Sequence, residues 1–175
     1  MNQNSPFFRL FITVALVWGS TFMTFPTGQS YANSKLNLDA NRYYTDGLQL
    51  SQANYWKEAA DEFRKAIQVD PKHKLAYANL GVALSQTGQH KEALLAFDEA
   101  MRLGYDHALL RYNRGLSFAS LNLVEEAVRE IELSLKQDFR NVRAVYNLGL
   151  LYLKQDRLTD ARNQVNLLYL RNNDL

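Results

Sequence analysis

Small and large apolar residues recur along this 175-residue chain with a period of 34 residues. The period is marked by four glycines: Gly47, Gly81, Gly115 and Gly149. An alanine stands twelve residues after each glycine and a large apolar residue four residues after the alanine, giving the pairs Ala59 and Phe63, Ala93 and Phe97, Ala127 and Ile131, and Ala161 and Val165. Residues four apart share one face of a helix, so each pair predicts the buried face of a helix. A fixed period of this length indicates a repeat protein.

Each repeat predicts two helices separated by a tight turn. The turn positions carry residue types that tolerate a left-handed backbone just after a helix end: Asn54, Gly88, Asn122 and Asp156. The second helix of each unit begins with an acidic residue, which the helix dipole favours: Glu58, Glu92, Glu126 or Asp160. Asp70 and Pro71 predict the end of the second helix in the first unit, because proline cannot donate a backbone hydrogen bond. Tyr105 and Phe139 stand at the equivalent position later, so those helix ends are expected to depend on packing.

This pattern resembles the tetratricopeptide repeat, and the resemblance covers residues 40–175. It implies an all-α fold, a right-handed superhelical solenoid of antiparallel helix pairs, with four units: residues 40–73, 74–107, 108–141 and 142–175. The glycine of the first helix and the alanine of the second let the two helix axes approach, and the large residue fills the space between neighbours.

Two units depart from the family pattern at the position before the glycine. Leucine is usual there, as at Leu80 and Leu148, whereas Asp46 and Arg114 stand in the other two units. The aliphatic stem of Arg114 is expected to lie on apolar surface with its guanidinium in water. Asp46 belongs to the outermost unit, which is expected to be covered less than the others.

The first 32 residues differ in composition from the repeats. They contain no acidic residue and one basic residue, Arg9, ahead of an apolar run over residues 10–18. The segment Ser30–Ala32 suits cleavage of a signal peptide after Ala32, which leaves residues 33–39 as a short linker. An uncleaved N-terminal anchor is the alternative, although the run from residue 10 to residue 25 spans only about 24 Å against a hydrocarbon core of about 30 Å. The protein is therefore expected to be extracytoplasmic (periplasmic, lumenal or secreted) or membrane-anchored by this segment.

The charge balance and residue types exclude several classes of function. The 20 basic and 18 acidic residues leave a net charge of +2, too small to indicate a nucleic-acid partner. The chain has no cysteine, which excludes disulfides, thiolate metal sites and cysteine nucleophiles. His73 and His107 are equivalent residues of neighbouring repeats, about 8 to 10 Å apart or more, and cannot share a metal ion.

Candidate acid and base residues do not form a catalytic pattern. One acidic group is interpreted as a solvated helix face: Glu125, Glu126, Glu130 and Glu132. The chain contains no glycine-rich phosphate loop, nucleophile elbow or zinc-protease motif. The sequence therefore predicts a protein that is not an enzyme and uses no cofactor and no metal ion.

In tetratricopeptide-repeat proteins the first helices line a concave groove that holds an extended peptide or a partner's helix. The resemblance assigns to this groove the positions three before and one after each glycine: Tyr44 and Leu48, Ala78 and Val82, Tyr112 and Leu116, and Tyr146 and Leu150. Asn79, Asn113 and Asn147 predict a ladder of amides able to bond a peptide backbone, and Arg143 favours an acidic partner. The alternative interpretation is that about half of this lining only packs between helices.

The expected function is that of a non-catalytic protein–protein adaptor or assembly factor in an extracytoplasmic compartment, with another protein held in the groove. The alternative is a structural module that self-associates, forming a homo-oligomer through its C-terminal repeat. That repeat carries no polar capping helix, and its last helix is rich in apolar residues: Leu167, Leu168, Tyr169 and Leu170.

Overall fold

The computed structural model describes residues 28–173, which form eight α-helices and no strand. The helices are α2 (Gly28–Gln52), α3 (Trp56–Val69), α4 (Lys74–Gln86), α5 (His90–Arg102), α6 (Ala108–Ser120), α7 (Val124–Gln137), α8 (Val142–Lys154) and α9 (Leu158–Asn173). The chain divides into two units, residues 1–35 and residues 36–175, and the second unit contains all the repeats. None of the helices in the described part is long and apolar enough to cross a membrane.

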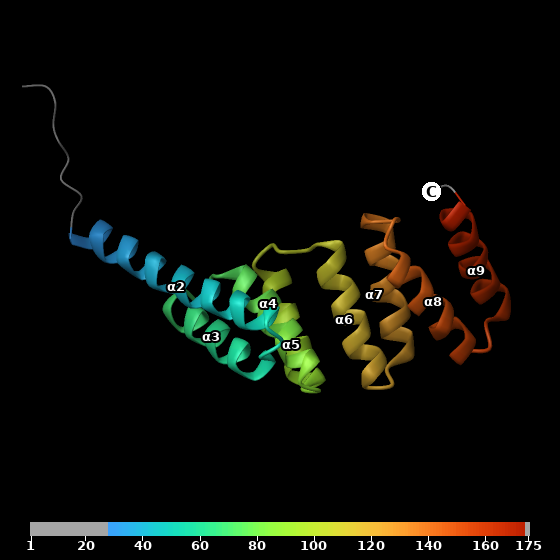
Figure 1. Ribbon diagram of the computed structural model, residues 1–175, viewed down its shortest axis with the longest axis horizontal. Helices are drawn as coiled ribbons and strands as arrows, with labels where there is room; N and C mark the ends of the chain where they lie inside the picture. Colours follow the sequence, from blue (N-terminus) through green and yellow to red (C-terminus); the bar gives the residue numbers. More distant parts are fainter. Residues whose placement is uncertain (1–27, 174–175) are drawn as a thin grey trace, which may run out of the picture. The chain divides into compact units, whose positions relative to one another are not determined.

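Within residues 36–173 the helices form a solenoid of pairs. Helices α4 and α5, α6 and α7, and α8 and α9 pack as pairs, and each pair contacts the next through α5 and α6 or α7 and α8 (Figure 1). The first helices α4 and α6 also touch each other. Each element therefore packs on its neighbours in sequence, as expected for an all-α repeat array.

The helix starts coincide with three of the expected repeat boundaries, and the first unit differs. Helices α4, α6 and α8 begin at residues 74, 108 and 142, but α2 begins at Gly28. Residues 33–39, expected to be a linker, are therefore helical, because no glycine or proline interrupts the chain between residues 29 and 46. Most of the expected leader, residues 1–27, lies outside the described residues.

The turns within the repeats have the predicted left-handed backbone. Asn54 and Asn122 have φ of 62°, Asp156 has 56° and Gly88 has 80°. The end of α5 was predicted wrongly, since it depends on a glycine as well as on packing: Gly104 has φ of 82°, and the Tyr105 amide donates to the Ala100 carbonyl at 2.9 Å.

Helices α3 and α7, the second helices of the first and third units, end on aspartates. The Asp70 carboxylate accepts a hydrogen bond from the Lys72 amide, and the Asp138 carboxylate accepts one from the Arg140 amide, each at 3.0 Å. An aspartate that bonds the backbone two residues later closes a local turn, so it ends the helix with or without the proline that follows Asp70.

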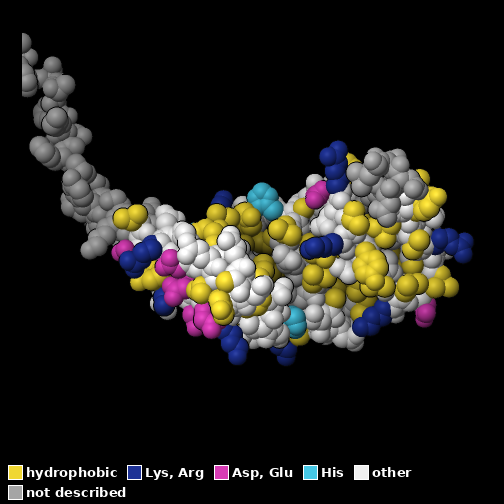
Figure 2. Space-filling view, in the orientation of Figure 1, with side chains coloured by type: hydrophobic (Ala, Val, Ile, Leu, Met, Phe, Trp, Pro, Cys, Tyr) yellow, Lys and Arg dark blue, Asp and Glu magenta, His cyan; other side chains and the backbone are white. Residues whose placement is uncertain are grey.

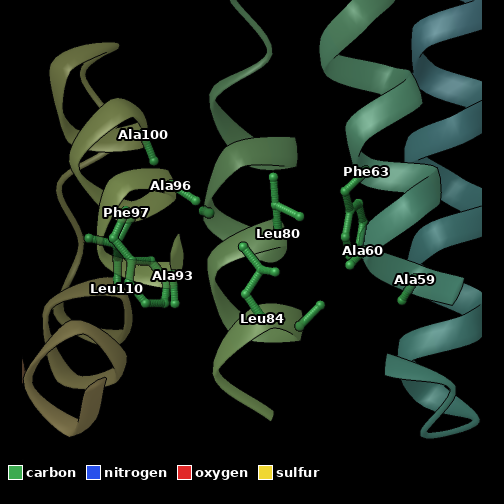
Figure 3. Packing of buried hydrophobic residues seen from close by; sticks show 12 residues of the cluster. Ala59, Ala60, Phe63, Leu80, Leu84, Ala93, Ala96, Phe97, Ala100 and Leu110 are labelled. Carbon is green, nitrogen blue, oxygen red and sulfur yellow. The ribbon is translucent and has the colours of Figure 1, made fainter. Parts of the chain in front are cut away.

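The contact between the glycine of the first helix and the large residue of the second holds each of the first three helix pairs together. A Cβ built on Gly47 would lie 2.6 Å from Phe63, one on Gly81 would lie 2.5 Å from Phe97, and one on Gly115 would lie 2.7 Å from Ile131. The three large side chains are fully buried, and Figure 3 shows Phe63 and Phe97 within the core around α4. Only glycine leaves room for these side chains at this helix spacing.

The last unit does not repeat this contact. The atom nearest to a Cβ built on Gly149 is the Cβ of Gln164, at 3.3 Å, and Val165 is exposed. The prediction that Val165 fills the space between neighbours is therefore wrong. Within the described residues no helix follows α9, so one side of this pair remains uncovered.

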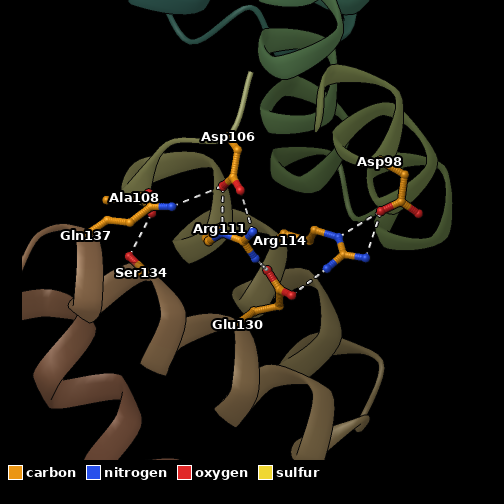
Figure 4. A network of polar contacts seen from close by, with 8 residues as sticks. All are labelled: Asp98, Asp106, Ala108, Arg111, Arg114, Glu130, Ser134 and Gln137. Atoms are coloured by element: carbon orange, nitrogen blue, oxygen red, sulfur yellow. Dashed lines mark hydrogen bonds and ion pairs between the residues drawn. The ribbon is translucent and has the colours of Figure 1, made fainter. Parts of the chain in front are cut away.

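A charged network joins α5, α6 and α7 (Figure 4). Arg114 bridges Asp98 of α5 and Glu130 of α7 with two contacts of 2.7 Å, and Arg111 contacts Glu130 at 3.3 Å and Asp106 at 2.5 Å. The Arg114 side chain is only 18% exposed, so its guanidinium is paired and not in water as predicted. Glu130 is buried, which contradicts its interpretation as part of a solvated face.

Two neighbouring groups extend the polar contacts between repeats. Hydrogen bonds from Arg111, and to a smaller extent from Gln137, hold the pKa of the Asp106 carboxyl below its usual range against the opposing effect of burial. Burial, followed by the hydrogen bond to Glu132, raises the pKa of the Tyr152 hydroxyl. Tyr152 is therefore a protonated donor to the Glu132 carboxylate, at 2.6 Å, and ties α8 to α7.

Replacing Gly81 by alanine is expected to lower the free energy of unfolding by about 1–2 kcal/mol, although alanine has the higher helix propensity by about 1 kcal/mol. The added methyl overlaps the buried Phe97 ring, which cannot move without repacking. Gly149→Ala is the matched control and should lower stability much less or not at all, because the nearest atom is the Cβ of the half-buried Gln164 at 3.3 Å, which needs to move by only a few tenths of an ångström. Chemical denaturation of the full chain compares the two, and equal effects would contradict the packing role of the glycine.

Replacing Glu130 by glutamine is expected to destabilise the chain by about 2 kcal/mol, because two partly buried arginines lose a shared carboxylate while each keeps a second one. The control is Glu126→Gln on the same helix, whose carboxylate lies 3.7 Å from the exposed Arg129. Loss of that surface pair should cost about 0.5 kcal/mol or less. Thermal denaturation at low and high salt checks both variants, and the network has no structural role if the two melt alike.

Candidate functional site

Two of the predicted groove tyrosines bond the asparagine of the following repeat. The Asn79 side-chain amide donates to the Tyr44 hydroxyl at 3.2 Å and to the Leu75 carbonyl at 3.0 Å. The Asn147 amide donates to the Tyr112 hydroxyl at 2.8 Å. Burial raises the pKa of the Tyr44 hydroxyl, which therefore stays neutral. These side chains join neighbouring first helices, so the amide ladder is used for repeat-to-repeat contacts at Asn79 and Asn147.

The tyrosine series is interrupted at the junction between α4 and α6. Ala78 stands where Tyr44 and Tyr112 stand in the adjacent repeats, so no hydroxyl is present there to bond Asn113. A pocket of about 180 Å³ lies at this junction, lined chiefly by Val82, Ser85, His90, Asn113, Leu116 and Ser117. It brings together three predicted groove residues, namely Val82, Asn113 and Leu116.

The wall of this pocket combines apolar side chains with several polar groups. The hydroxyls of Ser85 and Ser117 are hydrogen-bonded to each other at 2.7 Å across the two first helices. The Nδ1 atom of His90 is buried and has no hydrogen-bond partner among the described residues. Asn113 adds an amide able to donate and accept. The pocket is therefore suited to a small side chain that forms hydrogen bonds.

A second cleft lies at the C-terminal end of the array, between α8 and α9. It has a volume of about 430 Å³ and contains the predicted residues Tyr146 and Leu150 together with Leu153, Leu158 and Val165. The predicted residue Arg143 is exposed on the same first helix. Leu48, in α2, packs against the core of the first two units. The predicted residues are thus divided among a set of inter-repeat bonds, a polar pocket and an apolar cleft.

Sequence reasoning missed the serines and the histidine of the polar pocket. Ser117 and His90 do not recur at the 34-residue period, and Ser85 recurs only at Ser51, so the family resemblance gives them no role. One signal marked an irregularity between these two first helices, because alanine stands at position 78 of an otherwise regular tyrosine series, although Ala78 itself does not line the pocket.

The other two histidines have structural contacts. His73 caps α4, with its Nδ1 accepting from the Ala76 amide at 3.2 Å, and its ring lies 4.8 Å from that of Tyr44. The His107 ring lies 4.5 Å from the Tyr105 ring. Across the described residues, no three side chains of histidine, cysteine, aspartate or glutamate gather in a metal-binding arrangement.

Solved structures with a similar fold include three proteins with published descriptions. YrrB, described as a tetratricopeptide-repeat protein with an unusual peptide-binding site, matches with a TM-score of 0.69 and 22% identity over 76% of this chain and 69% of YrrB. MamA from Desulfovibrio magneticus RS-1 matches with a TM-score of 0.74 and 19% identity over 95% of this chain and 93% of MamA. The first repeat domain of Spaghetti (RPAP3), bound to the HSP90 peptide SRMEEVD, matches with a TM-score of 0.65 and 20% identity over 69% of this chain and 95% of that domain. At these identities the likeness concerns the fold alone.

The sequence matches family models, whereas a search of the curated proteins found no match. Family models described as tetratricopeptide repeat match residues 62–94, 86–139 and 112–174. These matches span more than half of the chain and include the helix pairs α4–α5, α6–α7 and α8–α9. This chain is therefore a member of the tetratricopeptide-repeat family.

Proposed function

We propose that this protein is a non-catalytic adaptor or assembly factor that holds a peptide segment of another protein across its first helices. Two of the structurally similar proteins, YrrB and Spaghetti (RPAP3), are described with a peptide-binding site or a bound peptide. The proposal rests chiefly on the pocket among α4, α5 and α6, which includes Asn113, a first-helix asparagine that lacks the tyrosine partner of Asn79 and Asn147.

The pocket accounts for how a peptide would be positioned. Val82 and Leu116 supply apolar walls, while Asn113 and the Ser85–Ser117 pair supply hydrogen-bonding groups. An extended peptide that inserts a serine, threonine, asparagine or aspartate side chain would place its backbone over the adjacent first helices. A buried polar group selects a matching partner strongly, since an apolar side chain there would leave the pocket's polar atoms without hydrogen bonds.

We further propose that the adaptor acts outside the cytoplasm. The support is the composition of residues 1–32, which contain an apolar run and small residues around the expected cleavage position but no acidic residue. The membrane-anchored form is the alternative for the same segment.

Photocrosslinking tests the peptide site. A photoreactive phenylalanine in place of Leu116 in the full-length chain is expected to crosslink a partner protein in native membranes or the extracytoplasmic fraction. The matched position is Leu95, which is exposed on α5 and lies outside the pocket. The adduct should form from position 116 and be absent from position 95.

Ala78→Tyr is the blocking variant for this experiment. Ala78 is buried in the core, as Tyr112 is at the equivalent position of the next repeat, so the new tyrosine has to be accommodated between the first helices. Bonded to Asn113 as Tyr44 bonds Asn79, it is expected to reduce the adduct from position 116 at least tenfold. A circular-dichroism melt controls for folding. Identical adducts from positions 116 and 95, or adducts unaffected by Ala78→Tyr, would contradict the proposed site.

Processing of the leader has a direct measurement. The mature protein isolated from the extracytoplasmic fraction is expected to begin at Asn33, because cleavage after Ala32 leaves Asn33 as the first residue. Edman sequencing gives this residue, and Ala32→Arg, which places a large charged side chain before the expected scissile bond, should prevent cleavage. An intact N-terminus in the membrane fraction would favour the anchor.

A further inference from the structure

The cleft between α8 and α9 is lined mainly by apolar side chains, several of which are exposed. Apolar side chains gather over this end of the array in Figure 2. Comparison with the preceding repeat shows what this surface lacks. Tyr146 is 56% exposed whereas its equivalent Tyr112 is 8% exposed, and Val165 is 60% exposed whereas its equivalent Ile131 is fully buried.

Helix α8 covers the preceding repeat, and its contacts show which side chains a helix uses to cover the end of a repeat. One face of α8 is buried against the preceding repeat and carries Ala144, Leu148 and Leu151. On the same side, the Asn147 amide donates to Tyr112, and Lys154 donates to Asn122 in the turn between α6 and α7 at 2.6 Å. The interface is therefore apolar in its centre. Its edges have polar contacts: a hydrogen bond from the Asn147 amide to Tyr112, a basic group at the turn, and hydrogen bonds from Tyr152 and Gln155 to glutamates of α7.

The α8–α9 end retains the groups that two of these contacts need, those made to Tyr112 and Asn122, whereas Asn166 stands where Glu132 accepts from Tyr152. Tyr146 keeps the hydroxyl of Tyr112 one repeat later, and Asp156 replaces Asn122 with the same left-handed backbone. A basic residue that bonds the Asn122 oxygen in the preceding repeat would meet a full negative charge at Asp156. The surface thus continues the interface between repeats and adds charge complementarity to it.

The first helix of a second copy does not fit this surface. The positions of α2 equivalent to the buried face of α8 carry Arg42, Thr45, Asp46 and Gln49. Docking this face on the apolar cleft would bury the charged groups of Arg42 and Asp46 without the matching partners. Helices α4, α6 and α8 of a second copy are already packed within their own array. The polar face of α2 also explains the unusual Asp46, since it faces away from the other repeats.

We propose that the α8–α9 cleft binds an amphipathic helix of a different protein. In the occupant, a small residue is followed by an asparagine three residues later and a leucine four residues later. Another apolar residue follows seven residues after the small residue, and a basic residue follows ten residues after it. The apolar residues fill the cleft, the asparagine amide bonds the Tyr146 hydroxyl, and the basic residue pairs with Asp156. This site shares no residue with the polar pocket among α4, α5 and α6, and the proposal does not depend on the peptide-adaptor function.

A peptide with the sequence of residues 142–157 tests the proposal, because it has this arrangement of side chains. A hydrocarbon staple through its positions 146 and 150 keeps it helical and uses side chains that are exposed in α8. Fluorescence anisotropy with the labelled peptide and the full-length chain is expected to give saturable one-to-one binding. Val165→Asp in the chain should weaken it at least tenfold, since a charge enters the apolar cleft.

A double-mutant cycle tests the hydrogen bond. Asn147→Ala in the peptide and Tyr146→Phe in the chain should each weaken binding about five- to tenfold, and both together no more than either alone. Asp156→Asn should weaken binding about threefold and reduce its salt dependence. Leu95→Asp, at an exposed position of α5, and Ala78→Tyr, on α4 and far from the cleft in the sequence of repeats, should leave the affinity unchanged.

Three outcomes would overturn the proposal. The first is the absence of saturable binding, and the second is equal affinity of Val165→Asp and the unchanged chain, with melting curves showing that both are folded. The third is a dimer of the chain alone in sedimentation that Val165→Asp converts to monomer, which would make a second copy the occupant. Normal helix binding by an Ala78→Tyr chain that no longer crosslinks through position 116 would separate this site from the peptide site.

Discussion

The close contact between a glycine and a large apolar side chain supports the rest of this structure. In three successive units the first helix approaches the second until the Phe63, Phe97 or Ile131 side chain lies directly over a glycine backbone. A side chain at the glycine position would hold the helices apart and leave the large residue without close packing. The regular spacing of the helix pairs follows from this contact, and the spacing places the first helices near enough to exchange hydrogen bonds between repeats. The tyrosine–asparagine pairs and the charged network around Glu130 are therefore consequences of the packing distance.

The outward-facing surfaces at the two ends of the array differ in polarity. On α2 the face that would receive a preceding repeat is polar. Arg42 stands where the internal first helices have alanine or leucine, and Asp46 stands where α4 and α8 have leucine and α6 has Arg114. The α8–α9 end instead keeps an apolar surface around a cleft, with Tyr146 available at its edge. Repeat arrays remain soluble through polar end faces, so an apolar end face is a place where another helix gains by binding. This asymmetry gives the array one closed end and one end able to accept a neighbour.

The interior of the array combines regular contacts with a single local exception. Tyr44 and Tyr112 accept hydrogen bonds from the next repeat, and these bonds hold first helices in register. Alanine at position 78 breaks the series, and the small pocket among α4, α5 and α6 has polar groups from Ser85, His90, Asn113 and Ser117. A regular groove would present the same chemistry along its length, whereas one interruption gives a single position that can distinguish among side chains. Binding specificity in such a protein can thus depend on a position where the repeated pattern of side chains is interrupted.

The sequence alone determined the repeat, the helix pairs and the positions of their turns. A period of 34 residues and the placement of glycine, alanine and left-handed turn residues are local properties that each unit repeats. It did not determine the state of individual side chains, because that depends on neighbours from other repeats. Arg114 was expected to reach water but pairs with Asp98 and Glu130, and Val165 was expected in the core but is exposed. The polar pocket could not be predicted for the same reason, since its lining residues come from three helices, α4, α5 and α6. Only the tertiary structure decided these points, because burial and hydrogen bonding are set by what packs across the interface between repeats.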